Sequence, residues 1–372
     1  MEIKKEIYVT QPDLPPFEDF VAYLEQIWES KWLTNDGNFN KEFEKKLADF
    51  LRVKYLSLMN NGTLALIIAL QELKITGEVI TTPYSFVATT HALWWNGIKP
   101  VFADIIPGQC NIDPERIEAA ITAKTTAIVP VHVYGHPCNV EKIQKIADTY
   151  GLKIIYDAAP AFGVEINGNS ILNYGDLSIL SFHATKAFNT IEGGAIICHD
   201  EKTKMRIDYL KNFGFAGETV VVAPGINAKM NELQAAYGLL QLKTIDEQIA
   251  KRQKINQLYR DLLSDIPGIS ISEFEENIKY NYAYFPIFVD ESLHGINRDD
   301  LYNKLKEHKI FSRRYYYPLI SNFSAYRGLD SAKAENLPIS NKMSNQVICL
   351  PIYSNLNEDD VKFIVSVIKS TQ

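Results

Sequence analysis

Two short segments of the sequence could bind a phosphate group and a flat ring. Asn60-Asn61-Gly62-Thr63 separates a predicted strand from a predicted helix, and its glycine permits a tight turn. Backbone N–H groups at such a helix start can receive a phosphate, although a plain helix cap is the commoner occurrence. Phe86 follows the next predicted strand and could stack on a flat ring, although a core phenylalanine is again commoner.

A carboxylate and an amine follow later predicted strands. Asp157 closes the apolar run LKIIYD, where an unpaired charge would be costly to bury, so it either caps a turn or faces a cation. Lys186 ends the segment SFHATK, a setting of small and apolar residues shortly before Gly193-Gly194. A lone lysine is usually a solvated surface group, but an amine withdrawn from water becomes available to react with a carbonyl group.

Together, these segments supply the parts that pyridoxal 5'-phosphate (PLP) requires. Its phosphate needs N–H donors, its ring needs a face to rest on, and its pyridine nitrogen needs an anion. Its aldehyde needs an amine with which to condense. Each segment alone has a more ordinary explanation, so the PLP hypothesis rests on their occurrence in one chain.

The elements that must position these segments alternate between β-branched runs and helical patterns. Strands are expected at 53–59, 77–82, 100–105, 125–135, 152–159 and 195–200. Helices are expected between them at 64–73, 85–97, 113–121 and 139–151. This alternation predicts an α/β fold with a mainly parallel sheet covered on both faces, which binds ligands at the carboxyl ends of its strands.

The pattern changes in the second half of the chain. Residues 230–263 are predicted to form a long helical stretch with at most one break. Two strand-like runs (282–290 and 347–353) and two amphipathic helical patterns (297–308 and 358–369) follow. We therefore predict a large PLP-binding domain with an N-terminal segment at residues 1–245 and a small α+β domain at residues 246–372.

Composition excludes several classes of protein. Hydrophobic residues make up 46% of the 372 residues and charged residues 22%, as in an ordinary globular protein. The balance of 38 Lys+Arg against 45 Asp+Glu, without a basic run, argues against nucleic-acid binding. No long apolar span or signal peptide is visible, so we expect no membrane segment and a cytoplasmic location. The four cysteines have no metal-binding spacing, so no metal site is expected.

Beyond these segments, the chain resembles the DegT/StrS-like family of nucleotide-sugar aminotransferases, which are fold-type I PLP enzymes. The resemblance covers almost the whole length, in the stretches NNGTLAL, TTPYSFVATTHA, PVFADI, VPVHVYG, YDAAPAFG, SFHATK, EGG, NAKMNELQAA and RRYYYPL. It implies a large domain with a mainly parallel sheet flanked by helices, and a small C-terminal α+β domain. It also implies a homodimer with shared active sites.

The resemblance assigns roles to individual residues. Lys186 would bind the PLP aldehyde, Asp157 would pair with the pyridinium nitrogen, and Phe86 would stack on the ring. For the phosphate, the resemblance implies backbone contacts from Gly62 and Thr63 and a hydroxyl contact from Ser181.

Asn227 matches the family asparagine that reaches the phosphate from the other subunit. Without the family, a cap on the following helix would be the simpler interpretation of Asn227.

Substrate contacts are less well marked. Arg313, Arg314 and Tyr316 could meet the sugar or its diphosphate, because arginine forks suit phosphate oxygens. Solvated arginines at a strand edge explain the arginines equally well. The chain also departs from the family, which usually has Gln or His at Pro160 and PLH at residues 318–320. The contact with the ring hydroxyl of PLP is therefore lost or replaced, and a sugar-binding role for this loop is weakened.

The resemblance implies amino transfer from L-glutamate to a nucleotide-linked keto sugar. Residues 9–37 favour conversion of dTDP-4-keto-6-deoxyglucose to dTDP-4-amino-4,6-dideoxyglucose, a step toward surface polysaccharide such as the O-antigen. Amination at C-3 of a dTDP-3-keto-6-deoxyhexose is an alternative, and so is a non-catalytic regulator or binding module on the same fold. A sugar dehydrase is disfavoured because related dehydrases replace the lysine with histidine.

Overall fold

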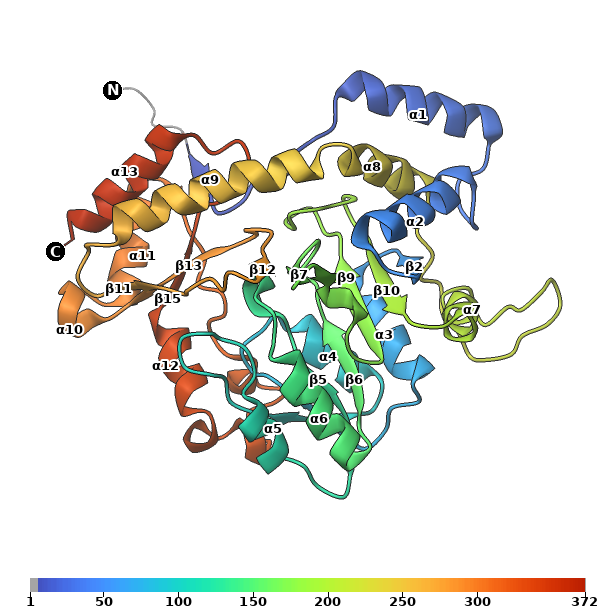
Figure 1. Ribbon diagram of the computed structural model, residues 1–372, viewed down its shortest axis with the longest axis horizontal. Coiled ribbons are helices and arrows are strands. Elements are labelled where there is room, and N and C mark those ends of the chain that lie inside the picture. Colours follow the sequence, from blue (N-terminus) through green and yellow to red (C-terminus); the bar gives the residue numbers. More distant parts are fainter. Residues whose placement is uncertain (1–5, 372) are drawn as a thin grey trace.

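A seven-stranded sheet forms the centre of the computed structural model, which describes residues 6–371 (Figure 1). The strand order is β2-β10-β9-β6-β5-β3-β4. Strands β9, β6, β5, β3 and β4 run parallel, whereas β10 is antiparallel to both of its neighbours. The predicted mainly parallel sheet is therefore confirmed, with one reversed strand. The strands are β2 Tyr55–Met59, β3 Glu78–Thr81, β4 Lys99–Phe102, β5 Thr125–Val129, β6 Lys153–Asp157, β9 Leu177–Ser181 and β10 Gly194–Cys198.

Side chains of the sheet alternate between two hydrophobic cores. In β10, Ala195 and Ile197 face one core, and Ile196 and Cys198 face the other. Helices cover both faces, as expected for a sheet that is apolar on each side. One face is covered by α2 Asn38–Leu51, α5 Pro114–Ala119, α6 Val140–Tyr150 and α8 Glu232–Leu242, and the other by α3 Gly62–Glu72, α4 Ala88–Trp95 and α7 Glu201–Leu210.

The predicted helical stretch at 230–263 consists of two helices with one break. Helix α8 ends at Leu242, and α9 (Ile245–Leu263) begins after Lys243 and Thr244. Helix α9 runs from the main sheet to the C-terminal part of the chain (Figure 1). It contributes Ile249 to the first core and Ile255 to the core of the C-terminal part.

The C-terminal part is built around a three-stranded antiparallel sheet with the order β11-β13-β15. Its core is closed by α9, α11 and α13. Two shorter helices and two strands complete the region. The elements are β11 Ile269–Ile271, β13 Phe285–Val289, β15 Val347–Leu350, α10 Glu291–His294, α11 Arg298–Glu307, α12 Pro338–Gln346, α13 Glu358–Lys369, β12 Ile278–Lys279 and β14 Ile310–Phe311.

The N-terminal segment joins this C-terminal part. Strand β1 (Ile7–Tyr8) pairs in parallel with β14, and Ile7 belongs to the C-terminal core. The sequence groups this segment with the large domain, whereas its first strand packs on the other part of the molecule. The division near residue 245 itself stays a prediction.

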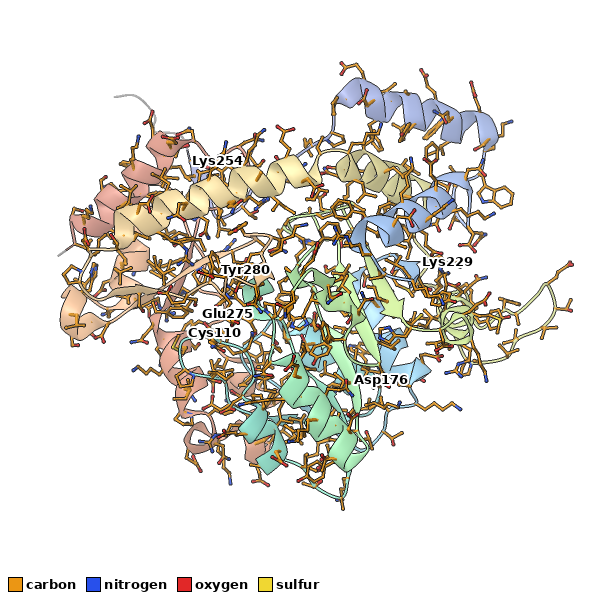
Figure 2. All side chains as sticks on the ribbon, in the orientation of Figure 1. Cys110, Asp176, Lys229, Lys254, Glu275 and Tyr280 are labelled. Atoms are coloured by element: carbon orange, nitrogen blue, oxygen red, sulfur yellow. The ribbon has the colours of Figure 1, made fainter. Side chains whose placement is uncertain are left out.

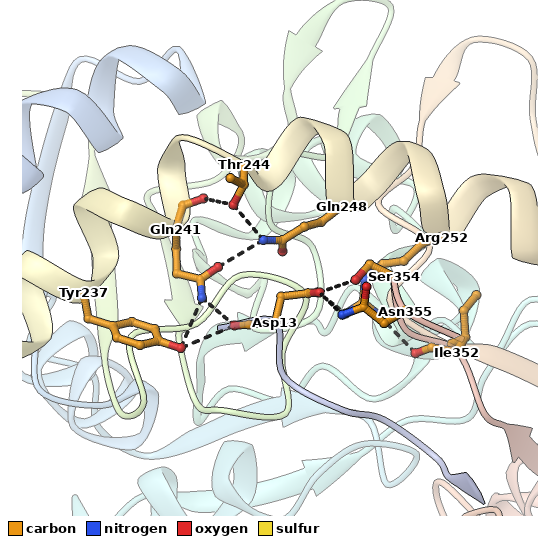
Figure 3. A network of polar contacts seen from close by, with 9 residues as sticks. All are labelled: Asp13, Tyr237, Gln241, Thr244, Gln248, Arg252, Ile352, Ser354 and Asn355. Carbon is orange, nitrogen blue, oxygen red and sulfur yellow. Dashed lines mark hydrogen bonds and ion pairs between the residues drawn. The ribbon is translucent and has the colours of Figure 1, made fainter. Parts of the chain in front are cut away.

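A polar network ties the N-terminal segment to both parts of the molecule (Figure 3). The backbone oxygen of Asp13 accepts a hydrogen bond from Gln241 Nε2 at 2.6 Å, and its carboxylate bonds to Ser354. Arg252 Nη1 donates to the Ile352 oxygen at 3.1 Å. The junction of α8 and α9 is therefore held against the N-terminal segment and the segment after β15.

Several elements, including β9, α2, α7, α1, β7 and β8, are not predicted by the sequence. Helix α1 (Phe17–Ser30) lies over α8, and strands β7 (Glu165–Ile166) and β8 (Asn169–Ser170) form a small sheet with β12. Over residues 6–371, no helix combines the length and apolar character needed to cross a membrane.

Candidate active site

A cavity of about 620 Å³ opens where the parallel strands of the main sheet end. Its walls come from the segments that follow β2, β3, β5, β6 and β9, together with residues of the C-terminal part. Ligands bind at this edge in open α/β sheets, because the connecting segments meet there. The predicted site residues that line the cavity are Gly62, Thr63, Phe86, Asp157, Ser181, Lys186 and Tyr316.

The start of α3 forms one wall of the cavity. Asn61 caps this helix, since its side chain accepts a hydrogen bond from the Leu64 N–H at 2.8 Å. The first N–H groups of a helix have no partner within it, so those of Gly62 and Thr63 suit an anion. A Cβ on residue 62 would lie 2.9 Å from Ser181 Cβ, so glycine is what lets α3 approach the end of β9.

Asp157 ends β6 and is buried, with 5% of its surface exposed. Its Oδ2 accepts a hydrogen bond from Thr89 Oγ1 at 2.6 Å, and its Oδ1 accepts one from the Ala159 N–H at 3.1 Å. Burial raises the pKa of Asp157, while these two hydrogen bonds and the nearby Lys186 partly oppose the shift. The carboxylate therefore caps a turn and also faces the cavity, where a cation would stabilise its charge.

Lys186 lies in the segment that follows β9. Asp157 ends β6, which is the strand next to β9 in the sheet. The side chain is half-buried, so its amine is not fully withdrawn from water. Its Nζ donates a long hydrogen bond of 3.5 Å to the hydroxyl of Tyr284, which lies just before β13. The amine thus sits where the main sheet and the C-terminal part meet.

An aromatic ring is available on another wall. Phe86 lines the cavity and is 62% exposed, so its ring is accessible from the cavity. Pro160 also lines the cavity and brings no side-chain donor to it. The departure from the family at residue 160 therefore falls within the site.

Three predicted residues lie outside the cavity lining. Arg314 Nη1 donates to Asp299 Oδ1 at 2.6 Å, and its guanidinium lies 4.6 Å from the Tyr302 ring centroid. Arg313 is exposed, and so is Asn227. In the part of the chain that the structure describes, Tyr316 is thus the one predicted sugar contact at the cavity. Substrate binding by the two arginines stays a prediction.

Sequence analysis missed several residues of the cavity wall. Thr89 lies three residues after Phe86, near the start of α4, and nothing in its local pattern marks it. Tyr284 and Tyr315 come from the C-terminal part, and no local pattern marks them. His183 and Glu192 also line the cavity, with 3.6 Å between His183 Nε2 and Glu192 Oε1. Within residues 6–371, no three or more His, Cys, Asp or Glu side chains are grouped to hold a metal ion.

Fold and site together define a class of enzyme. Residues 17–369 match the model of the DegT/DnrJ/EryC1/StrS aminotransferase family, and the chain belongs to this family. The resemblance seen in the sequence is therefore confirmed, and the chain is an aminotransferase.

Individual relatives are similar over nearly their full lengths. The chain is 57% identical to dTDP-4-amino-4,6-dideoxy-D-glucose transaminase from Escherichia coli, over 96% of each chain. It is 52% identical to the Shigella dysenteriae protein of the same name, over 99% of each.

Solved structures confirm the predicted α/β fold-type I architecture. DesI, crystallised with its TDP-sugar product, has a TM-score of 0.94 at 34% identity and covers 99% of this chain and 93% of its own. PseC from Helicobacter pylori, an aminotransferase of pseudoaminic acid biosynthesis, has a TM-score of 0.91 at 30% identity and covers 99% of both chains.

Proposed function

We propose that this enzyme moves an amino group from L-glutamate to dTDP-4-keto-6-deoxyglucose and so forms dTDP-4-amino-4,6-dideoxyglucose. The proposal rests on the observation that Lys186, Asp157 and the start of α3 line the same cavity. The Escherichia coli relative that is 57% identical is named as the transaminase of this amino sugar.

The residues of the cavity fit PLP. A buried carboxylate with a raised pKa gains from a cationic pyridine nitrogen, and the exposed Phe86 ring offers a flat apolar face. Gly62 and Thr63 offer backbone N–H groups and Ser181 a hydroxyl for the phosphate. When bound, PLP supplies an aldehyde that takes up the amino group and a ring that accepts electrons.

Lys186 has two roles in this proposal. Its amine would hold the cofactor. When not bonded to the cofactor, the same amine would accept a proton from the α-carbon of the amino donor, and it would deliver a proton to the sugar carbon that receives the nitrogen. Tyr284 accepts a hydrogen bond from this amine and so helps to hold it within the cavity. Asp157 keeps a proton on the pyridine nitrogen, because its own charge is otherwise poorly solvated.

A homodimer completes the phosphate site in this proposal. Asn227 is exposed and outside the lining of its own cavity, so it is free to serve a second copy of the chain. Each cavity would then combine Gly62, Thr63 and Ser181 of one copy with Asn227 of the other.

Product identification tests the proposed reaction. The purified enzyme is incubated with L-glutamate and a panel of dTDP-linked and UDP-linked 3-keto and 4-keto sugars, and products are identified by mass and NMR. We expect the 4-amino product from the dTDP-linked 4-keto sugar. A preference for a 3-keto sugar would assign amination at C-3, and no product with any sugar would favour a non-catalytic role.

A further inference from the structure

An apolar arm extends from the end of α7. The arm comprises residues 213–226 and projects away from the body of the molecule (Figure 1). Its exposed large apolar side chains are Phe213, Phe215, Val220, Val221, Val222 and Ile226. A patch of this kind is unfavourable in water and marks an interaction surface. Since Asn227 directly follows the arm, a second copy seated on it would lie beside Asn227.

Lys229, which is labelled in Figure 2, links the two ends of the arm by hydrogen bonds. Its Nζ donates to Asn212 Oδ1 at 2.8 Å on the outgoing leg and to Asn227 Oδ1 at 3.0 Å on the returning leg. Asn212 and Asn227 also form an antiparallel backbone bridge. The Lys229 ammonium lies 4.9 Å from the Phe213 ring centroid, and burial lowers the pKa of this lysine.

The chemistry of the two side chains fixes the orientation of the Asn227 amide. A lysine ammonium can only donate hydrogen bonds, so it must engage the amide oxygen of Asn227 and not the nitrogen. The two N–H groups of Nδ2 then lie on the opposite side of the amide. An amide without this partner could turn its oxygen outward, which would repel an anion.

We propose that Lys229 is a positioning residue that presents the amide N–H groups of Asn227 to a phosphate held in the cavity of a second copy. This inference rests on the proposed function, because that phosphate belongs to PLP. It adds a residue that touches neither cofactor nor substrate and acts through Asn227.

The test compares PLP with 5'-deoxypyridoxal, which lacks the phosphate. Lys229→Met removes the donor and keeps most of the apolar stem. We expect the dissociation constant of PLP, measured by absorbance titration, to rise about tenfold, as for the loss of one charge-assisted hydrogen bond. The constant for 5'-deoxypyridoxal should change by less than about twofold. Lys202→Met, an exposed lysine on α7, is the charge control and should leave both constants unchanged.

A double variant tests whether Lys229 acts through Asn227. In the Asn227→Ala background, Lys229→Met should weaken PLP binding little further. Equal losses for the two ligands, or losses that simply multiply in the double variant, would overturn the proposal. Borohydride labelling of Lys186 tests the proposed function separately. A failure of the Lys229 proposal can therefore be distinguished from a failure of the proposed function.

A second variant decides the question if Lys229→Met disturbs folding or dimer formation. Asn227→Asp keeps an oxygen for Lys229 and replaces the N–H donors with a negative charge. We expect dimers of normal stability by sedimentation, with PLP binding weakened at least as much as by Lys229→Met. PLP binding equal to that of the unmodified protein would contradict an amide contact with the phosphate.

Discussion

Lys186 and Asp157 reach one cavity from the ends of neighbouring strands, β9 and β6. Neighbouring parallel strands end at the same edge of a sheet, so residues well separated in sequence come together there. Their separation explains why neither residue alone marks an active site in the sequence. The pKa of the Asp157 carboxylate depends on this placement, because the group is buried beside Thr89.

The pH dependence of stability should report the burial of Asp157. Because its pKa is raised in the fold, the folded cofactor-free protein binds this proton more tightly than the unfolded chain. The resulting stabilisation is present in acid and is lost as the pH rises through the raised pKa. In Asp157→Asn, the free energy of unfolding should therefore fall less between about pH 4 and pH 7 than in the unmodified protein.

Urea denaturation of the cofactor-free proteins at a series of pH values measures this difference. Asp19→Asn, on the exposed side of α1, is the control and should leave the pH profile unchanged. Identical profiles for Asp157→Asn and the unmodified protein would show that Asp157 is not desolvated as described.

The cavity could be predicted from the sequence only where its residues follow strands. Gly62, Phe86 and Lys186 stand a few residues after apolar runs, so their positions follow from the topology of a parallel sheet. Tyr284 and Tyr315 reach the cavity through packing of the C-terminal part, which no local pattern encodes. Arg314 was considered for the diphosphate because an arginine fork suits phosphate oxygens. The structure pairs it with Asp299, and its substrate role stays a prediction.

Helix α2 depends on a cap that comes from another element. Its N-cap residue, Gly37, has no side chain, and the buried carboxylate of Glu232 on α8 accepts hydrogen bonds from the Phe39 and Asn40 N–H groups, both at 2.9 Å. Glu232 therefore satisfies the first turn of α2 and links it to α8. This contact holds together two helices that cover one face of the main sheet.

Removing this cap should destabilise the protein. Glu232→Ala leaves two buried N–H groups without a partner, and we expect a loss of about 2 kcal/mol in the free energy of unfolding. Glu232→Gln keeps one acceptor oxygen and should lose less. Urea denaturation of both variants provides the comparison, and a loss in Glu232→Ala no greater than in Glu232→Gln would contradict the capping role.

Sequence patterns predicted the elements of the sheet better than those near the N-terminus. The β-branched runs and helical patterns between residues 53 and 157 predicted the elements there, although the strand expected at 125–135 ends at Val129. Helix α2 was not predicted, although Phe39, Phe43 and Leu47 recur at a spacing of four residues on its buried face. Helix α1 buries only Ile27 among its described residues, so its pattern is weak.

At the scale of the whole molecule, the arm is the surface that we place against a second copy. Val221→Asp places a charge in the middle of its exposed apolar side chains. If the arm lies in a dimer interface, this charge would be desolvated, so dimers should dissociate at concentrations where the unmodified protein is dimeric. Activity should fall as well, because each cavity would lose Asn227 of the other copy.

Sedimentation velocity over a range of concentrations measures this effect. Thr149→Asp, exposed on α6 away from the arm, is the control and should not change the sedimentation profile. A monomeric unmodified protein, or Val221→Asp dimers of undiminished stability, would remove the arm from any dimer interface.

Contacts between residues near opposite ends of the chain could not be predicted from the sequence. Strand β1 joins β14, and Asp13 bonds to Ser354, although these partners stand near opposite ends of the chain. Such contacts depend on the completed C-terminal core and not on a local pattern of residues. The long helix α9, by contrast, falls within the helical stretch predicted at residues 230–263, because its helical pattern is local.

The central claim is that the Lys186 amine condenses with the PLP aldehyde. Borohydride reduction of the PLP-loaded enzyme followed by peptide mass analysis tests it most directly. We predict one pyridoxyl group per chain, attached to Lys186, and none in Lys186→Ala treated in the same way. A pyridoxyl group on another lysine, or an unlabelled protein, would contradict the account.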